Sequence, residues 1–314
     1  MNTMIGWLAR WLVVAGAGLL AAGAQAQQDL RIIHGSSAGA PQDVMLRVLA
    51  DEMSKISGSR VLIEPTPGAD GKISHAALLR AQADGRTLLA EGTGITSILQ
   101  LPGHEHEWTD FEPLYRMQLD PFALYALPSR YADLKSFVAD MKAQPDKVRL
   151  GGWATGGPFH IISMQLAAEA KGKFDWIPYT SGGKAIVEMI GGNIEGVMSN
   201  ISVYNTFKQR TVVLAHSGEA RLAQFPEVPT LKELGYNIVR YHWRGLFIKK
   251  GTPEALIQKN YELVQAAVKS ARFQTFLKDT ATLDGTLTRA GFREMLAKQA
   301  ADDAVILKQI KIIQ

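Results

Sequence analysis

The stretch from Leu30 to Pro41 reads LRIIHGSSAGAP and sets a pattern that returns later in the chain. Leu30–Ile33 is an apolar run that predicts a short strand, and His34–Pro41 is a loop of mostly small residues. A helix is expected from about Gln42, because apolar residues then recur near a period of 3.6, at Met45, Leu46, Leu49, Met53 and Ile56. The order is strand, small-residue loop, helix.

Strands and helices continue to alternate after this opening. Further strands are expected at Val61–Glu64 and Thr87–Ala90, and a second series begins with Val148–Gly151, followed by Trp176–Tyr179 and Val212–His216. Strand–helix–strand order predicts right-handed crossovers and a largely parallel sheet. The sequence therefore indicates two α/β units.

Small-residue loops lead into predicted helices at Gly35–Ala40, Gly152–Pro158 and Thr180–Gly183. Such loops leave backbone N–H groups free at the helix start, where the helix dipole adds positive potential. A phosphate, sulfate or carboxylate can bind there without a formal cation. Because ligands of open α/β sheets bind beyond the carboxyl ends of the strands, the loops predict an anion held between the two units.

Composition excludes several classes of protein. The chain has 314 residues, enough for two domains, and 46% of them are hydrophobic, as expected for a packed globular protein. Without cysteine it has no disulfide, thiolate metal site or cysteine nucleophile. The net charge of +4 is spread along the chain, so nucleic acid is not an expected partner.

The first 26 residues have the pattern of a secretory signal peptide. Arg10 precedes an uncharged run, Trp11–Gly23, and Ala24-Gln25-Ala26 supplies a small-x-small cleavage site. The apolar run is short for a membrane span. We therefore expect cleavage before Gln27 and export to a bacterial periplasm.

Several segments, in the same order, resemble those of the Bug family, the extracytoplasmic receptors of tripartite tricarboxylate transporters. His34–Asp43 followed by Arg47 resembles the family's Pro-Gly-Gly-x-x-Asp-x-x-x-Arg segment. The other matching segments are Pro67–Gly71, Asp84–Leu89, Pro178-Tyr179 with Gly191-Gly192, Pro226–Thr230 with Glu233–Gly235, and Gly251–Pro253. Together they cover nearly all of the chain after the signal peptide.

The resemblance implies an α/β fold of the periplasmic binding protein type II-like class. Two α/β lobes would be joined by a two-segment hinge, with the ligand in the cleft between them. Lobe one would comprise residues 27–124 and 246–314, and lobe two residues 125–245. The chain would cross between them near Tyr125 and near Trp243–Gly245.

The way in which the family binds a carboxylate implies which residues of this chain face the ligand. Ser36, Ser37, Ala38 and Gly39 would lie opposite Thr155, Gly156 and Gly157, with the loops at Glu91–Gly94 and Thr180–Gly182 completing the walls. The full set of expected ligand contacts is Ser36, Ser37, Ala38, Gly39, Asp43, Thr93, Trp153, Thr155, Gly156, Gly157, Thr180, Ser181, Gly182 and Asn200. Pro158 departs from the family pattern and removes an N–H donor, which together with Trp153 favours a larger or aromatic acid.

Several of these residues also allow a plainer interpretation. Asp43 either faces solvent or holds the binding loop, Trp153 either stacks on a ligand or packs, and Asn200 either lines the pocket or ends a strand. Arg244 either meets a distal carboxylate or forms a surface or interlobe pair, and His160 either donates to an anion or is a partly exposed histidine. The pair His104 and His106 lacks a third metal ligand, and the segment before Lys184 lacks the spacing of a phosphate loop.

The function expected from these features is capture of a dicarboxylate, tricarboxylate or aromatic acid and its delivery to the membrane subunits of a transporter. No cofactor, metal or catalytic residue is expected, and the receptor would be a monomer. Two alternatives stay open. One is a sensory subunit that signals to a membrane kinase, and the other is a secreted hydrolase, for which the motifs G-x-S-x-G and H-E-x-x-H are absent.

Overall fold

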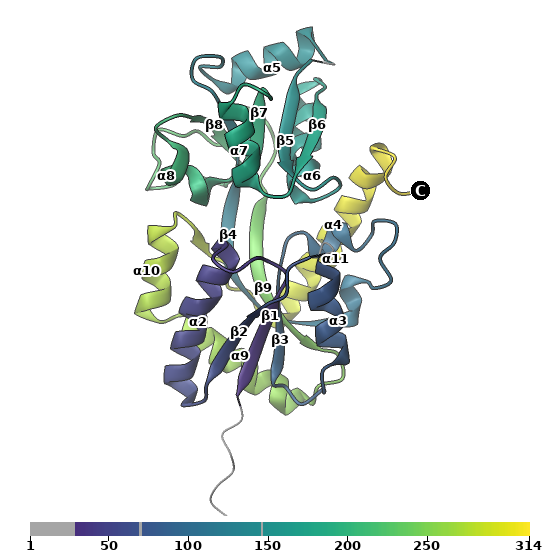
Figure 1. Cartoon of the computed structure of the whole chain (residues 1–314), viewed down its shortest axis with the longest axis vertical. Coiled ribbons are helices and arrows are strands. Elements are labelled where there is room, and N and C mark those ends of the chain that lie inside the picture. Colours follow the sequence, from purple (N-terminus) through teal and green to yellow (C-terminus); the bar gives the residue numbers. More distant parts are fainter. Residues whose placement is uncertain (1–28, 69–70, 146) are drawn as a thin grey trace, which may run out of the picture.

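The structure is a computed structural model that describes residues 29–68, 71–145 and 147–314. It consists of two α/β lobes, one above the other in Figure 1, joined by two strands that run between them. The expected signal peptide, residues 1–26, lies outside the described residues, as do Ala69 and Asp70 of the Pro67–Gly71 segment. In the described part of the chain, no helix has the length and apolar character needed to cross a membrane.

Lobe one is a sheet with helices on both faces. Its parallel strands are β1 (Leu30–His34), β2 (Val61–Pro65) and β3 (Thr87–Gly92). One face packs on α2 (Pro41–Ser57), α9 (Glu254–Val268) and α10 (Ala271–Asp279). The other packs on α3 (Lys72–Arg80), α4 (Ile95–Ile98) and α11 (Arg289–Gln309), while η2 (Trp108–Asp110) leads into the next strand. Two buried clusters thus sandwich the sheet.

Local sequence explains where the first helix begins and ends. Pro41 stands in the first turn of α2, where its missing N–H costs nothing. Gly58 follows the helix with a φ of 70°, a left-handed conformation that favours glycine, and its N–H donates to the Ser54 carbonyl. These signals fix the start of α2 directly after the small-residue loop.

Lobe two repeats the arrangement. Its strands are β5 (Arg149–Trp153), β6 (Asp175–Tyr179), β7 (Gly196–Asn200) and β8 (Val212–His216), of which β5 is parallel to β6 and β7. Helices α5 (Leu134–Ala143) and α6 (Pro158–Ala170) cover one face of this sheet. The other face carries α7 (Gly182–Ile190), η3 (Ile201–Val203) and α8 (Tyr204–Phe207).

Two long strands join the lobes. Strand β4 (Phe111–Ala126) pairs with β9 (Tyr241–Lys249) from Phe111 to Pro121, and with β7 and β8 from Phe122 to Ala126. All of these pairs are antiparallel, and so are β3–β9 and the pairing of β10 (Leu283–Asp284) with β4. The expected parallel pairing therefore holds among β1, β2 and β3 and among β5, β6 and β7. It does not hold for any pair that involves β4 or β9, because the chain must go out and return side by side.

The change of sheet along β4 falls between Pro121 and Phe122, and β9 begins at Tyr241. Both points lie slightly before the predicted crossings at Tyr125 and Trp243–Gly245. The exact division of residues between the lobes stays a prediction.

Helix α11 also touches both lobes. Its first half packs Phe292 and Leu296 into lobe one. Its last turns bring Ile306 and Leu307 against Ile161 of α6 in a separate buried cluster. Figure 1 shows this helix leaving the lower lobe and ending beside the upper one. The lobes are therefore connected on one side by a helix as well as by two strands.

Candidate functional site

The predicted ligand loops follow the carboxyl ends of β1, β3, β5 and β6, and Asn200 ends β7. The two sets of loops touch at one edge of the gap between the lobes, since a Cβ added to Gly94 would lie 3.5 Å from the Trp153 ring. Away from this edge several of the expected contacts are exposed: Ser37, Ala38, Gly39, Thr155, Thr180 and Ser181. The predicted residues thus follow strand ends in both lobes, and their role as ligand contacts stays a prediction.

Asp43 holds the lobe-one loop in place. The side chain is 2% exposed, so the solvent-facing interpretation is wrong. Its carboxylate accepts the Gly39 N–H at 2.9 Å and two bonds from the Arg47 guanidinium, at 2.9 and 3.1 Å. The Nε2 atom of His34 lies 3.1 Å from the other side of the carboxylate. Asp43 is therefore a positioning residue behind the loop.

The charges of this cluster are balanced within the protein. Burial alone would raise the pKa of Asp43, but the hydrogen bonds from Arg47 and Gly39 outweigh it and hold the pKa below its usual value. Burial lowers the pKa of His34 despite its contact with Asp43, so its imidazole is neutral at pH 7. The loop itself presents backbone groups and hydroxyls to the cleft. Of these, the Ser36 hydroxyl donates to Gln42 Oε1 at 2.7 Å.

The start of α7 presents the clearest free helix terminus in the second lobe. Ser181 caps the helix, its Oγ accepting the Lys184 N–H at 3.2 Å. Thr180 and Ser181 are exposed, and a Cβ added to Gly183 would meet nothing within 4 Å. An anion can therefore approach the first N–H groups of this helix.

The loop before α6 is less available than expected. Its Gly156 and Gly157 are buried, and the Gly156 N–H donates to His160 Nδ1 at 3.1 Å instead of pointing to solvent. A Cβ on Gly156 would lie 2.9 Å from Leu101 and 3.3 Å from Leu307, both outside lobe two. In this conformation the Gly156 N–H is thus used within lobe two, by His160, while the glycine itself packs against residues outside that lobe. Thr155 is the exposed residue of the loop.

His160 fits neither of its two sequence interpretations. It is 7% exposed and stacks on Trp176 with ring centroids 4.6 Å apart. Burial lowers its pKa to about 4, so the ring is neutral and accepts a hydrogen bond from Gly156. The half-buried Trp153 packs near Gly94 and Gly157, which gives it a packing role at the contact between lobes.

Thr93, an expected ligand contact, lies within the hinge. Its side chain is fully buried, and its hydroxyl accepts the Trp243 N–H at 2.7 Å and lies 3.2 Å from the Tyr241 carbonyl. The residue follows β3 as predicted, but β9 passes directly beside it and occupies its hydrogen-bonding capacity. Thr93 therefore ties the hinge together and offers no side-chain group to the cleft in this conformation.

Arg244 forms an internal pair in the hinge. Its guanidinium donates to Gln118 at 2.6 Å and to Asp120 at 3.4 Å, and Asp120 also accepts the Ser202 hydroxyl at 2.6 Å. Burial raises the pKa of Asp120 while Arg244 opposes the shift, and burial likewise lowers the pKa of Arg244 while Asp120 opposes it. Asp120 therefore neutralises the charge of Arg244, which agrees with the interpretation of Arg244 as a member of an ion pair within the protein.

His242 was missed by sequence reasoning. It lies on β9 at the crossing, where its ring stacks on Phe159 with centroids 5.6 Å apart and meets the edge of Phe122 at 5.9 Å. Its Nδ1 is buried and has no hydrogen-bond partner among the residues that the structure describes. The pairing of β9 with β4 brings it to the crossing between the lobes, and no local pattern indicates that pairing.

The remaining sequence candidates do not form a site. The described residues contain no group of three or more histidine, aspartate or glutamate side chains that could hold a metal, and His106 lies beside Asp110 at 3.8 Å. Lys184 is exposed on the first turn of α7.

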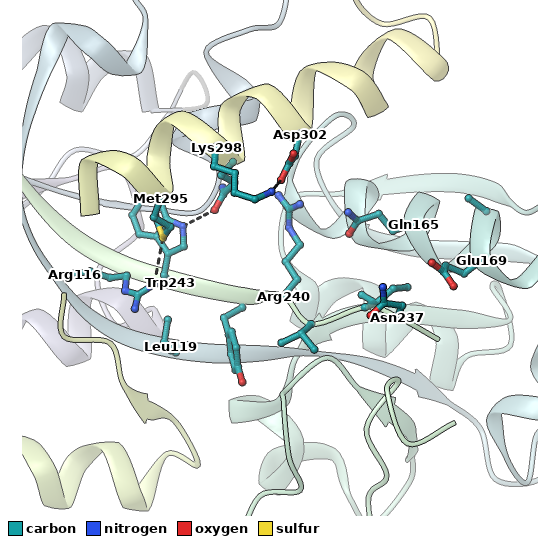
Figure 2. A pocket seen from close by; sticks show the side chains of 15 residues that line it. Arg116, Leu119, Gln165, Glu169, Asn237, Arg240, Trp243, Met295, Lys298 and Asp302 are labelled. Atoms are coloured by element: carbon teal, nitrogen blue, oxygen red, sulfur yellow. Dashed lines mark hydrogen bonds and ion pairs between the residues drawn. The ribbon is translucent and has the colours of Figure 1, made fainter. Parts of the chain in front are cut away.

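A groove of about 680 Å³ lies between α6, α11 and the segment that enters β9. Figure 2 shows Arg240 reaching across it toward α11. The guanidinium of Arg240 donates to the carboxylate of Asp303 on that helix at 2.5 Å. The lining includes Gln165, Glu169 and Trp243 and none of the predicted ligand contacts. This groove is therefore separate from the candidate cleft.

Comparison with known proteins agrees with this architecture. The family model described as the tripartite tricarboxylate transporter family receptor matches residues 45–311. A Cupriavidus necator protein, named as a UPF0065 protein in the gbd 5' region, is 30% identical over 275 residues, covering 84% of this chain and 83% of that protein. BugT of Bordetella pertussis is 28% identical over 285 residues, covering 86% and 87%.

Two solved structures are similar in fold. MatC from Rhodopseudomonas palustris with bound malate has a TM-score of 0.78 at 21% identity, covering 89% of this chain and 98% of that chain. An R. palustris protein solved with adipate has a TM-score of 0.82 at 17% identity, covering 90% and 97%. At these identities the likeness concerns the fold, which is that of a two-lobe solute-binding protein.

Proposed function

Because the chain belongs to the receptor family of tripartite tricarboxylate transporters, we propose that it captures a small organic carboxylate by closure of its two lobes. The ligand would lie between the loop after β1 and the start of α7, and the closed receptor would present it to the membrane subunits of such a transporter. No chemistry is performed on the ligand. The protein acts in the periplasm as a monomer, after removal of residues 1–26.

One observation supports this proposal: each lobe has a small-residue helix start with exposed residues, after β1 in lobe one and after β6 in lobe two. In lobe one the loop at Ser37–Gly39 is exposed and is tied from behind by Asp43. In lobe two Thr180 and Ser181 are exposed beside the open space at Gly183. Backbone donors and hydroxyls from both sides suit a carboxylate oxygen, which accepts several hydrogen bonds at once.

The energy available from such contacts is sufficient for a receptor. A dissociation constant of about 1 μM requires about −8 kcal/mol. Hydrogen bonds to a charged group contribute about 1.5–3 kcal/mol each, so four or five of them reach this range after ordering costs. Malate in MatC and adipate in the other R. palustris structure are dicarboxylates of different length, which supports acids of this class as candidates.

A thermal-shift screen of the chain from Gln27 onward tests the proposal. Monocarboxylates, dicarboxylates, tricarboxylates and aromatic acids are compared at matched ionic strength. A ligand at a hundred times its dissociation constant adds about 2.7 kcal/mol of stability, which is several degrees in Tm for a protein of this size. A panel without any shift would overturn carboxylate binding.

A pair of variants then places the site. Ala38→Leu adds a bulky side chain to the exposed lobe-one loop, and we expect it to weaken binding by at least tenfold. Ala132→Leu, an exposed alanine just before α5 at the far end of lobe two, is the matched control and should bind as the wild type does. Equal affinity of the two variants would show that the ligand lies elsewhere.

A further inference from the structure

The groove between α6, α11 and the segment that enters β9 takes its walls from both lobes. Lobe two contributes Gln165 and Glu169 of α6, and lobe one contributes Arg116 of β4 and Met295 of α11. The groove volume of about 680 Å³ lies within the range of small-molecule sites, which is about 300–1,000 Å³. A molecule bound there would contact both lobes at once.

Two buried polar atoms of groove-lining residues have no hydrogen-bond partner among the described residues. They are Oε1 of Gln165 and Nε of Arg240. Figure 2 shows the two side chains next to each other in the middle of the groove. The guanidinium of Arg240 is held by Asp303, so its free Nε has a fixed position. Buried polar atoms without a partner are rare in folded proteins, which makes this pair a candidate for ligand contacts.

The chemistry of this pair fits a peptide amide. Gln165 Oε1 accepts a hydrogen bond and Arg240 Nε donates one. An amide group does both, because its N–H donates and its C=O accepts. A carboxylate only accepts and an ammonium group only donates, so either would satisfy one of the two atoms and not the other.

One end of the groove carries a cation without a carboxylate partner. Arg116 donates through Nε to the Gly285 carbonyl at 2.5 Å and through Nη1 to Met295 Sδ at 3.2 Å. It forms no ion pair among the residues that the structure describes. Burial lowers the pKa of Arg116, and the charge of Asp284 opposes this shift without reversing it. An arginine stays protonated nonetheless, so this end of the groove favours an anionic group.

The other end carries a carboxylate without a cation. Figure 2 shows Glu169 at the side of the groove opposite Arg116. Glu169 is exposed and has no ion-pair partner in the described part of the chain. Between the two ends the charges are already paired, since Lys298 donates to Asp302 at 2.7 Å. The groove therefore matches a molecule with a negative group at the lobe-one end and a positive group at the lobe-two end.

We propose that this groove binds a short peptide with free termini. Its carboxylate lies at Arg116, its ammonium group lies at Glu169, and a peptide amide bridges Gln165 and Arg240 between them. Each extended residue adds about 3.3–3.6 Å, so the distance between the two charged ends selects a peptide length. This site is separate from the candidate cleft and does not depend on which ligand the cleft binds.

Calorimetry with alanine peptides of different length tests the site in the chain from Gln27 onward. Dialanine, trialanine, tetraalanine and pentaalanine are compared, and one of them should bind with a dissociation constant below about 1 mM. The same peptide with an acetylated N-terminus should bind about threefold or more weakly, because it loses the ion pair with Glu169. Amidation of its C-terminus should have an effect of at least this size, because Arg116 is the more buried of the two charges.

Three variants assign the parts of the peptide to the parts of the groove. Glu169→Gln should remove the preference for a free over an acetylated N-terminus and keep the preference for a free C-terminus. Arg116→Gln should do the reverse. Gln165→Leu should weaken free and capped peptides alike. Glu169 is exposed, so its replacement maintains the test if Arg116→Gln fails to fold.

Two control variants separate this site from general disturbance and from the candidate cleft. Glu262→Gln alters an exposed glutamate on α9, which packs on the face of the lobe-one sheet opposite α11. It should keep both terminal preferences. Ala38→Leu changes the exposed loop of the candidate cleft and should leave peptide affinity unchanged. Loss of peptide binding in Ala38→Leu would place the peptide in the cleft and overturn the proposal.

Two further results would also overturn it. One is the absence of binding for all four peptide lengths. The other is equal affinity of free and capped peptides, or a preference for the free N-terminus that survives Glu169→Gln.

Discussion

Replacement of Asp43 by asparagine tests whether a buried carboxylate outside the ligand's reach sets the shape of the lobe-one loop. The change keeps the size of the side chain and removes its charge. In the wild type, the Asp43 carboxylate accepts one hydrogen bond from the Gly39 N–H and two from the Arg47 guanidinium, and it contacts His34 Nε2. All four distances lie between 2.9 and 3.1 Å. An amide has one acceptor oxygen and cannot satisfy all of these groups.

The expected loss of stability follows from how exposed each hydrogen-bond partner of Asp43 is. The Arg47 side chain is 55% exposed, so water can solvate the guanidinium once the ion pair with Asp43 is lost. This part of the loss of stability is therefore under about 1 kcal/mol. His34 is fully buried and its Nδ1 already has no partner among the described residues, so a weakened Nε2 contact costs about 1–3 kcal/mol. We expect Asp43→Asn to destabilise the protein by about 2 kcal/mol in total.

Urea unfolding gives the stability change, and calorimetry with the ligand found in the screen gives the effect on the loop. Asp51→Asn is the control on the same helix, because Asp51 pairs with Arg272 at 2.9 Å with both side chains about half exposed. It should cost less than about 1 kcal/mol and leave binding unchanged. If Asp43→Asn costs no more than Asp51→Asn and binds ligand equally well, Asp43 does not organise the loop.

The pH dependence of the same pair of proteins supplies a second readout. Since the folded pKa of Asp43 lies below its unfolded value, its contribution is present above the unfolded pKa and is lost as pH falls through the folded pKa. Asp43→Asn should therefore lose part of the acid-side decline in stability, whereas Asp51→Asn should keep it.

Three other perturbations have clear expected results. Burial lowers the pKa values of His160 and His216 to about 4. The free energy of unfolding of the wild type should therefore fall by about 3 kcal/mol for each histidine as the pH drops from about 6.5 to 4, and thermal melts of His216→Asn should show a smaller decline. Gly285→Ala would place a Cβ 2.6 Å from the backbone nitrogen of Gln118, and we expect urea unfolding to show a loss of about 1–3 kcal/mol. Leu307→Ala removes part of the buried cluster between α11 and α6, and it should lower the free energy of unfolding by about 2–5 kcal/mol. Because this cluster connects the lobes, solution scattering should also show a larger radius of gyration for the ligand-free variant.

Local patterns predicted the parts of the fold in which neighbours in sequence are neighbours in space. The strand at Leu30–His34, the helix that follows it and the small-residue loop between them match because each depends on nearby residues alone. Strand β8 lies at Val212–His216, as predicted from its apolar run. The family resemblance added the two-lobe arrangement, which periodicity by itself did not establish.

Local sequence patterns did not predict strand β4. Strand β4 spans sixteen residues and contains Pro113, Asp120 and Pro121, which interrupt any simple strand pattern. Its partner β9 lies more than a hundred residues later, so only tertiary pairing stabilises it. The surroundings of residues near this hinge could therefore not be predicted: the Thr93 hydroxyl is bonded to β9, and no pattern indicated that His242 lies at the crossing.

The distribution of charge explains how such a cleft can bind an anion and still release it. Arginines near the cleft are occupied within the protein, Arg47 by Asp43 and Arg244 by Asp120. A buried ion pair between ligand and arginine would carry a large desolvation cost on opening. In the proposed site, backbone N–H groups and hydroxyls from the two lobes would instead offer several moderate contacts that depend on both lobes being close together. Affinity is then lost when the lobes separate, and this coupling of binding to closure is what a receptor that must hand on its ligand requires.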